Sequence, residues 1–215
     1  MIKGVIFDLD GVLVSTDKLH FMAWKRLANE IGICDYSLED NIRQRGVGRM
    51  DSLEILLQKS DGVYTQLEKK ELCDQKNRYY QELLSACKEN ILLPGAERTL
   101  ALLQEKGVKI AIGSSSSNAL QIIKKVNIES YIDACVCGKD AVNSKPNPEI
   151  FLKACEKINV EAKLCLVIED ASVGIEAAKR ANMKSLGVGY NFQELKADYI
   201  AKDLDSVSDW SLILE

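Results

Sequence analysis

The chain has 215 residues, of which 47% are hydrophobic and 28% are charged, and its formal net charge is −4. This composition is typical of a globular protein, and without a basic tail or long charge block it gives no support for nucleic-acid or polybasic membrane binding. Seven cysteines without C-x-x-C spacing and a single histidine argue against a zinc site. No secretory signal precedes the first apolar run, and no apolar stretch reaches the roughly 18–20 residues of a membrane span. We therefore expect a cytoplasmic protein in which most cysteines are small core residues.

Short apolar runs rich in β-branched residues predict a series of buried strands. They occupy residues 4–9, 108–113, 133–137, 164–168 and 185–189, with a weak sixth at 198–201. Helical periodicity over residues 95–106, 118–126, 148–158 and 172–182 fills the intervals between most of them. Continuously apolar strands that alternate with helices predict an α/β fold with a doubly wound, Rossmann-like parallel sheet covered on both faces.

Residues 15–91 break this alternation, because they contain no convincing strand. Helices are predicted over residues 17–31, 51–59 and 65–88. We therefore expect an α/β core domain built from residues 1–14 and 92–215, with an all-helical cap domain, residues 15–91, inserted after the first strand. An insertion at the carboxyl end of a strand is a natural lid, since ligand sites of α/β proteins lie at that edge.

Two pairs of acidic residues follow predicted strands. Asp8 and Asp10 end the first, within V-I-F-D-L-D-G, and Glu169 and Asp170 end the fourth. Like charges at the end of a core strand are costly unless a counter-ion offsets them, and Mg²⁺ prefers carboxylate and carbonyl oxygens. Taken singly, each pair is also explained by solvated loop residues or by complementation of a helix dipole.

Two further strand ends carry groups that bind anions. The second strand is followed by S-S-S-S-N at residues 114–118, where hydroxyls and backbone N–H groups at a helix start would cradle a phosphate. A hydrophilic loop with Asn118 as N-cap explains this segment equally well. Lys145 follows the third strand, and by itself it would be a surface lysine. Because all these groups follow different strands, together they favour one phosphate site at the carboxyl edge of the sheet.

The order of these motifs resembles the haloacid dehalogenase superfamily of phosphotransferases. The motifs are an apolar run ending in D-L-D-G-V-L, a strand ending in S-S-S, then K-P, then E-D-x-x-x-G. The helical insertion resembles the cap domain of that superfamily, and within it the likeness is strongest to the β-phosphoglucomutase family. It spans the whole chain and is carried by FDLDGVLVSTDKLHFMAW (7–24), RGVGRMDSL (45–53), QKNRYY (75–80), SSSSNA (114–119), SKPNPEIF (144–151) and IEDASVGI (168–175).

The resemblance implies a role for each group. Asp8 would be the nucleophile that becomes an aspartyl phosphate, and Asp10 would be the general acid and base. Mg²⁺ would be bound by Asp8, the backbone carbonyl of Asp10, Glu169 and Asp170. The residues expected to bind substrate are His20, Arg45, Gly46, Val47, Arg49, Ser52, Lys76, Ser114, Ser115, Ser116, Asn118 and Lys145.

Within that set, Ser114, Ser115 and Lys145 would hold the transferring phosphoryl group. A sugar bisphosphate carries a second phosphate, which Arg49 would grip with help from Ser116 and Asn118. The remaining residues belong to the cap. There, the 45–48 segment and Ser52 would approach the sugar, while His20 and Lys76 would couple Asp10 to cap closure. Without the resemblance, His20 would be an ordinary helix histidine and Arg49 a solvated surface charge.

The reaction that the resemblance implies is the interconversion of β-D-glucose 1-phosphate and glucose 6-phosphate through β-glucose 1,6-bisphosphate. The expected partner is this small-molecule sugar phosphate, with neither nucleic acid nor membrane, and the expected chain is a monomer. One alternative is a Mg²⁺-dependent sugar-phosphate phosphatase, and another is a non-enzymatic signalling receiver with an aspartate phosphoacceptor. A receiver needs neither the insertion nor its cations. Departures from the family pattern at Ser15, Arg45, Ser117 and Ala171 remove no expected catalytic group.

Overall fold

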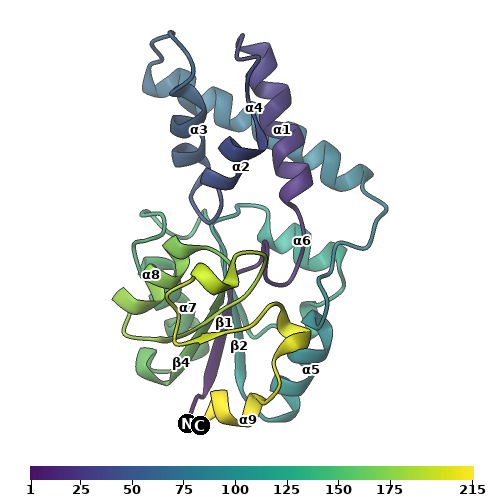
Figure 1. Ribbon diagram of the computed structural model, residues 1–215, viewed down its shortest axis with the longest axis vertical. Coiled ribbons are helices and arrows are strands. Elements are labelled where there is room, and N and C mark those ends of the chain that lie inside the picture. Colours follow the sequence, from purple (N-terminus) through teal and green to yellow (C-terminus); the bar gives the residue numbers. More distant parts are fainter. The chain divides into compact units, whose positions relative to one another are not determined.

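The chain folds into two compact units, and the computed structural model describes residues 1–215 (Figure 1). The α/β unit comprises Met1–Ser15 and Ile91–Glu215, and the helical unit comprises Thr16–Asn90. No helix in either unit combines the length and the apolar character that crossing a membrane requires. Each unit has its own secondary structure and is described by itself.

A six-stranded parallel sheet forms the centre of the α/β unit. Its strands are β1 (Gly4–Phe7), β2 (Lys109–Gly113), β3 (Ala134–Val136), β4 (Cys165–Glu169), β5 (Lys184–Gly187) and β6 (Tyr199–Ile200). They lie in the order β3-β2-β1-β4-β5-β6, and every neighbouring pair is parallel. This is the order of a doubly wound Rossmann-like sheet, so the predicted fold class is confirmed.

Helices cover the two faces of this sheet because alternate strand residues point to opposite sides. Helices α7 (Glu149–Ile158) and α8 (Ser172–Arg180) cover one face, where Ile6 of β1 and Val167 of β4 share a core cluster with Phe151. Helix α5 (Ala96–Glu105) packs against β2 from the other side (Figure 1). Helices α6 (Ala119–Lys125) and α9 (Trp210–Leu214) and four short 3-10 turns, Glu129–Tyr131, Ala162–Leu164, Phe192–Glu194 and Leu204–Ser206, complete the unit.

The helical unit contains α1 (Asp17–Glu30), α2 (Leu38–Arg43), α3 (Arg49–Leu57) and α4 (Gln66–Ala86). Helices α1 and α4 pack along each other, and their buried residues include Trp24 and Leu27 of α1 and Tyr80 and Leu84 of α4. The sequence pattern predicts three of these helices and misses α2. That helix has only six residues, too few to show a periodic apolar face, and a capping box between Ser37 and Asp40 defines its start.

The carboxyl edge of the sheet has a topological switch point. The chain passes from β1 to β2 on one side, and later enters β4 on the other side of β1. Crevices at such a reversal are where open α/β sheets bind ligands. Phe7, the last residue of β1, aligns with Ile112 of β2 and Ile168 of β4. The residues that follow these three strands therefore emerge side by side.

Candidate active site

Asp8 lies at this switch point and forms an ion-pair network with Lys145 and Glu169. The backbone N–H of Asp8 donates to the carbonyl of Ile168 at 2.9 Å, which extends the β1–β4 ladder by one bond. The ammonium Nζ of Lys145 lies 2.6 Å from Asp8 Oδ1 and 2.6 Å from Glu169 Oε1. All three side chains are buried, so Lys145 is not the surface lysine that its sequence context alone would suggest.

The charges of this network are coupled. Burial and the neighbouring charge of Asp8 raise the pKa of Glu169 to about 7, although Lys145 opposes the rise. Burial by itself would lower the pKa of Lys145, but the two carboxylates raise it above its usual range. Lys145 therefore stays protonated and holds a positive charge directly beside Asp8.

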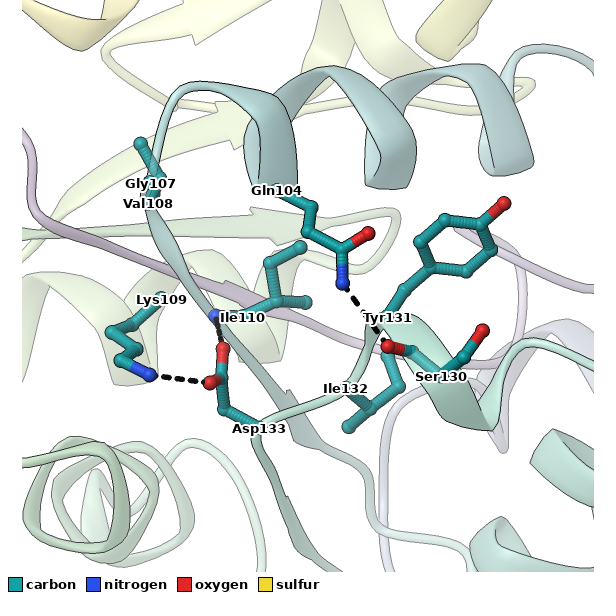
Figure 2. A pocket seen from close by; sticks show the side chains of 9 residues that line it. All are labelled: Gln104, Gly107, Val108, Lys109, Ile110, Ser130, Tyr131, Ile132 and Asp133. Atoms are coloured by element: carbon teal, nitrogen blue, oxygen red, sulfur yellow. Dashed lines mark hydrogen bonds and ion pairs between the residues drawn. The ribbon is translucent and has the colours of Figure 1, made fainter.

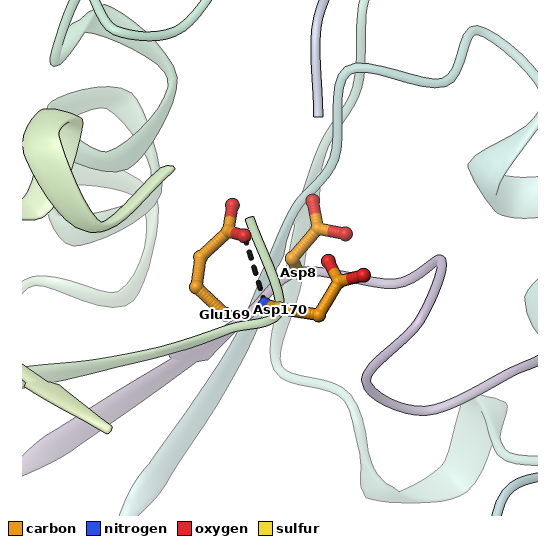
Figure 3. Close-up of side chains that lie close together, drawn as sticks. All are labelled: Asp8, Glu169 and Asp170. Carbon is orange, nitrogen blue, oxygen red and sulfur yellow. Dashed lines mark hydrogen bonds between the residues drawn. The ribbon is translucent and has the colours of Figure 1, made fainter. Parts of the chain in front are cut away.

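Asp170 joins Asp8 and Glu169 in a cluster of carboxylates (Figure 3). One oxygen from each of the three lies within 4.8 Å of the others. Two glycines leave room for these carboxylates. A Cβ at Gly11, where φ is +88°, would lie 2.2 Å from Asp170 Oδ2, and a Cβ at Gly174 would lie 1.8 Å from Glu169 Oε1. Glycine is therefore required at both positions to leave the acids where they are.

The donor set of this cluster fits a hard divalent cation such as Mg²⁺. Its oxygen ligands come from three carboxylates, the type that Mg²⁺ prefers. A carboxylate has about four acceptor positions, and Glu169 uses three of them for Lys145 and for the backbone N–H groups of Asp170 and Ala171. One position remains for a metal. The neighbouring Lys145 offsets only part of the negative charge, so a cation is favoured.

Magnesium is expected to stabilise the chain. At a free Mg²⁺ concentration one hundred times its Kd, the gain would be about 2.7 kcal/mol, which corresponds to a rise in Tm of roughly 5–10 °C for a chain of this size. Thermal unfolding in EDTA and in excess MgCl₂ measures this. The Asp170→Asn variant serves as control and should lose most of the rise. Equal Tm values for the wild-type chain in both conditions would contradict a magnesium site at this cluster.

The serine-rich segment after β2 forms a tight turn at the same edge. Ser116 N–H donates to Ser114 Oγ at 3.1 Å, and Asn118 N–H donates to Ser116 Oγ at 3.2 Å. The turn is packed closely, since a Cβ at Gly138 would lie 2.2 Å from the carbonyl oxygen of Ser115. Asn118 occupies the N-cap position of α6, but its side chain makes no capping hydrogen bond. The predicted role of Ser114–Ser116 and Asn118 in binding phosphate stays a prediction.

Glu149 holds the loop that carries Lys145 in place. The sequence pattern predicts only that Glu149 lies in the first turn of a helix and gives no sign of this role. Glu149 accepts hydrogen bonds from the N–H groups of Val142 and Asn143 at 3.0 and 2.9 Å, and forms an ion pair with Lys153 at 2.6 Å. These bonds lower the pKa of Glu149 to about 2, so it remains ionised. Glu149 thereby orders the segment that leads to Lys145.

In the helical unit, three predicted site residues come together around α4. Lys76 Nζ lies 2.8 Å from His20 Nδ1, and it also lies over the ring of Trp24, 4.7 Å from the centroid. The ring of His20 packs against Tyr80, with centroids 4.3 Å apart. Burial, Lys76 and Arg49 together lower the pKa of His20 well below 6.5. His20 is therefore neutral at neutral pH, and its Nδ1 can accept a hydrogen bond from the Lys76 ammonium.

The neutral state of His20 can be tested directly, because it is the chain's only histidine. We expect its imidazole NMR resonances to stay constant between about pH 7.5 and pH 5.5, where an ordinary histidine titrates. Protein without a histidine tag gives a single imidazole signal. The Lys76→Gln variant, which removes one of the charges that oppose protonation, should titrate at higher pH than the wild type. A wild-type midpoint near 6.5 would contradict the assignment.

The remaining predicted residues have varied settings. Asp10 is half-buried in the turn after β1, where its backbone bridges to Val14. Arg45 forms an ion pair with Asp17. Ser52 is buried, and its hydroxyl donates to the Gly48 carbonyl at 3.0 Å. Gly46 and Val47 are half-buried in the segment between α2 and α3, and Gly46 has a positive φ of 74°.

A cavity of about 170 Å³ lies elsewhere in the α/β unit, beside the amino ends of β2 and β3 (Figure 2). Its polar groups already bond to one another. Asp133 accepts from Lys109 Nζ at 2.6 Å and from Ile110 N–H at 2.8 Å, and Gln104 Nε2 donates to the Ser130 carbonyl at 3.1 Å. Figure 2 shows these contacts in the cavity wall, whose single carboxylate is that of Asp133, so the cavity has no cluster of acids like that of Asp8, Glu169 and Asp170.

Comparisons with known proteins agree with this geometry. The sequence profile of the haloacid dehalogenase-like hydrolases matches residues 2–182. The chain is 39% identical over 208 residues to a β-phosphoglucomutase of Bacillus subtilis, covering 96% of this chain and 92% of the relative. It is also 36% identical over 200 residues to a phosphorylated carbohydrates phosphatase of Thermotoga maritima, covering 91% of this chain and 89% of the relative. A crystal structure of β-phosphoglucomutase from Clostridium difficile matches with a TM-score of 0.91 and 36% identity, covering 99% of this chain and 96% of that one. The chain therefore belongs to the haloacid dehalogenase-like hydrolase family.

Proposed function

We propose that the chain is a Mg²⁺-dependent β-phosphoglucomutase, which interconverts β-D-glucose 1-phosphate and glucose 6-phosphate through β-glucose 1,6-bisphosphate. The observation that carries this proposal is the buried Asp8, whose Oδ1 is held 2.6 Å from Lys145 beside the acids Glu169 and Asp170. A fixed, desolvated carboxylate next to a permanent cation is suited to nucleophilic attack on phosphorus. The similarity to β-phosphoglucomutases supports the choice of substrate.

Asp8 attacks phosphorus through Oδ2, and its other oxygen, Oδ1, accepts a hydrogen bond from Lys145. A bond forms between Oδ2 and phosphorus while the bond from phosphorus to the sugar oxygen breaks, and Asp10 gives that oxygen a proton. In the second half-reaction Asp10 removes the proton of another sugar hydroxyl, which takes the phosphoryl group from Asp8. Lys145 offsets the charge on the phosphoryl oxygens, and Ser114 and Ser115 donate hydrogen bonds to them.

The residues that would hold Mg²⁺ are Asp8, the backbone carbonyl of Asp10, Glu169 and Asp170. Bound there, the ion supplies positive charge that offsets the charge of the transferring phosphoryl group. Glu169 has one acceptor position left for this purpose, as its hydrogen bonds show. Lys145 and the backbone N–H groups that bond Glu169 keep its carboxylate in a fixed orientation.

The second phosphate of the sugar bisphosphate is assigned to Arg49, with help from Ser116 and Asn118. Arg49 is half-buried, and burial lowers the pKa of its guanidinium, although not enough to remove the charge. In the helical unit, Arg45, Gly46, Val47 and Ser52 are assigned to contacts with the sugar. His20 and Lys76 are assigned to the coupling of Asp10 with the movement of that unit.

A sugar-phosphate phosphatase of the same family is the second candidate function. Its support is the similarity to the phosphorylated carbohydrates phosphatase of Thermotoga maritima. Both candidates share Asp8 as nucleophile, and they differ in whether a sugar hydroxyl or water accepts the phosphoryl group. The assignment of Arg49, Ser116 and Asn118 to a second phosphate favours a sugar hydroxyl as the acceptor.

A coupled assay distinguishes the two functions. The purified chain is incubated with Mg²⁺, β-glucose 1-phosphate and a trace of β-glucose 1,6-bisphosphate, and both glucose 6-phosphate and free phosphate are measured. The mutase predicts rapid formation of glucose 6-phosphate with negligible free phosphate. Rapid release of phosphate without glucose 6-phosphate would reject the mutase. The Asp8→Asn variant, purified in the same way, corrects for enzymes of the expression host.

Replacing Arg49 with alanine should reduce isomerisation by about 100-fold, because two charge-assisted hydrogen bonds to the second phosphate are lost at about 1.5 kcal/mol each. Hydrolysis of 4-nitrophenyl phosphate should change little, since this substrate has no second phosphate. The matched control is Arg43→Ala, which removes an exposed arginine of the same unit. Equal losses of both activities in Arg49→Ala would show that Arg49 does not serve a second phosphate.

A further inference from the structure

The guanidinium of Arg49 bonds to an amide rather than to a carboxylate, a kind of partner that the exposed Arg43 also has in Gln58. Arg26, Arg45, Arg98 and Arg180 each form an ion pair with a carboxylate. The Nη2 atom of Arg49 instead donates to the amide oxygen Oδ1 of Asn77 at 2.9 Å. An amide accepts the hydrogen bond but does not neutralise the charge, so Arg49 keeps its full positive charge.

One face of α4 fixes Arg49 at two points. Cys73 and Asn77 are four residues apart and therefore lie on the same side of the helix. The Cys73 thiol contacts the Arg49 carbonyl oxygen at 3.7 Å, while Asn77 holds the guanidinium. The backbone and the charged end of Arg49 are thus both tied to α4, which reduces the freedom that a long side chain would lose on binding a ligand.

The surroundings of Arg49 favour an added anion. Arg49 is the first residue of α3, where the positive end of the helix dipole opposes a cation, and the N-cap Gly48 has no side chain to cap the first turn. Arg49 also lies close enough to His20 to lower its pKa, as Lys76 does. The acid that most affects Arg49 is Asp74, which is exposed. The fixed guanidinium therefore stands at the positive end of α3 without an ion-pair partner, and the acid in the first turn of that helix, Asp51, is exposed.

We propose that Asn77 is a positioning residue that holds Arg49 in place for the second phosphate of the substrate while leaving its charge uncompensated. This inference rests on the proposed assignment of that phosphate to Arg49. A carboxylate in place of the amide would hold Arg49 equally well, but it would compete with the phosphate for the same guanidinium. Because the amide at position 77 is uncharged, it does not compete with the phosphate for Arg49, and the affinity for a doubly phosphorylated sugar is higher than it would be with a carboxylate there.

The test is the nearly isosteric substitution Asn77→Asp, which keeps the acceptor oxygen and adds a negative charge. We expect the KM for β-glucose 1,6-bisphosphate to rise about tenfold or more, with little change in kcat or in the hydrolysis of 4-nitrophenyl phosphate. The matched control is Gln58→Glu, because Gln58 Oε1 accepts from Arg43 Nη2 at 2.7 Å in an exposed pair of the same kind. This control should leave the bisphosphate KM and the hydrolysis of 4-nitrophenyl phosphate unchanged. The Asn77→Ala variant keeps the charge balance and should raise the bisphosphate KM less than Asn77→Asp does.

Several results would overturn the proposal. One is a wild-type KM for the bisphosphate in Asn77→Asp, and another is an equal rise in Gln58→Glu. A parallel loss of both activities with a lowered Tm would indicate a merely structural role. If Asn77→Asp does not fold, Asn77→Ala decides, since an unchanged bisphosphate KM there refutes the positioning role. The KM can be measured whether the phosphoryl group passes to sugar or to water, so failure of the mutase proposal is recognised separately, by the absence of glucose 6-phosphate in the wild type.

Discussion

Replacing Asp8 with asparagine should abolish phosphoryl transfer while the chain stays folded. The amide cannot act as the nucleophile, so we expect kcat/KM to fall at least about 10⁴-fold for both a sugar phosphate and 4-nitrophenyl phosphate. The fold should persist because Lys145 retains Glu169 as an ion-pair partner at 2.6 Å. Steady-state kinetics and the circular-dichroism spectrum of the variant test the two halves of this prediction.

The matched control for that substitution is Asp133→Asn. Like Asp8, Asp133 lies next to a strand and forms an ion pair with a lysine, Lys109, at 2.6 Å. Unlike Asp8, it lies at the amino ends of the strands, beside β3. This variant should retain near wild-type activity. Full activity in Asp8→Asn would remove Asp8 from the mechanism, and a loss in Asp133→Asn as large as that in Asp8→Asn would show that the assay reports folding rather than chemistry.

Replacing Lys145 with methionine should damage both stability and activity. The change leaves Asp8, Glu169 and Asp170 as clustered acids without their buried cation, and breaking a buried ion pair in this way costs about 3–5 kcal/mol of the free energy of unfolding. Activity should fall about 10³-fold or more, because the positive charge beside the transferring phosphoryl group is lost. Urea unfolding with and without Mg²⁺ measures the first effect, and Mg²⁺ should restore part of the stability.

Lys109→Met provides the corresponding control. Its ion pair with Asp133 is partly exposed, so its loss should change the free energy of unfolding by no more than about 1 kcal/mol. If Lys145→Met is no more destabilising than Lys109→Met, the buried ion pairs around Asp8 do not contribute the expected free energy of unfolding. If Lys145→Met retains high activity, its charge is not needed for transfer.

The strands of this fold are predictable from the sequence because each is a short apolar run between polar residues. All six predicted strands agree with the observed ones to within two residues at either end. The parallel order then brings the residues after Phe7 and Ile168 to one edge of the sheet. Helices α2 and α9 are missed, since their six and five residues are too few to show helical periodicity.

The sequence predicts the positions of the charged residues at this edge better than it predicts the residues that support them. Asp8, Lys145 and Glu169 can be expected at one edge because each follows a predicted strand, and their 2.6 Å contacts place them together there. The roles of Glu149 and Asn77 are not predictable in the same way. They depend on which backbone N–H groups or guanidinium the tertiary fold brings to them, and no local pattern encodes that.

Phosphorylated Asp8 should be directly detectable during turnover. Acid quenching of the wild-type chain in the presence of β-glucose 1,6-bisphosphate and Mg²⁺, followed by borohydride reduction, converts an aspartyl phosphate to homoserine that peptide mass spectrometry locates. We predict homoserine at position 8, none at Asp10, and none in the Asp8→Asn variant. Continuous turnover with an unmodified Asp8, or with homoserine at position 10 instead, would contradict the mechanism.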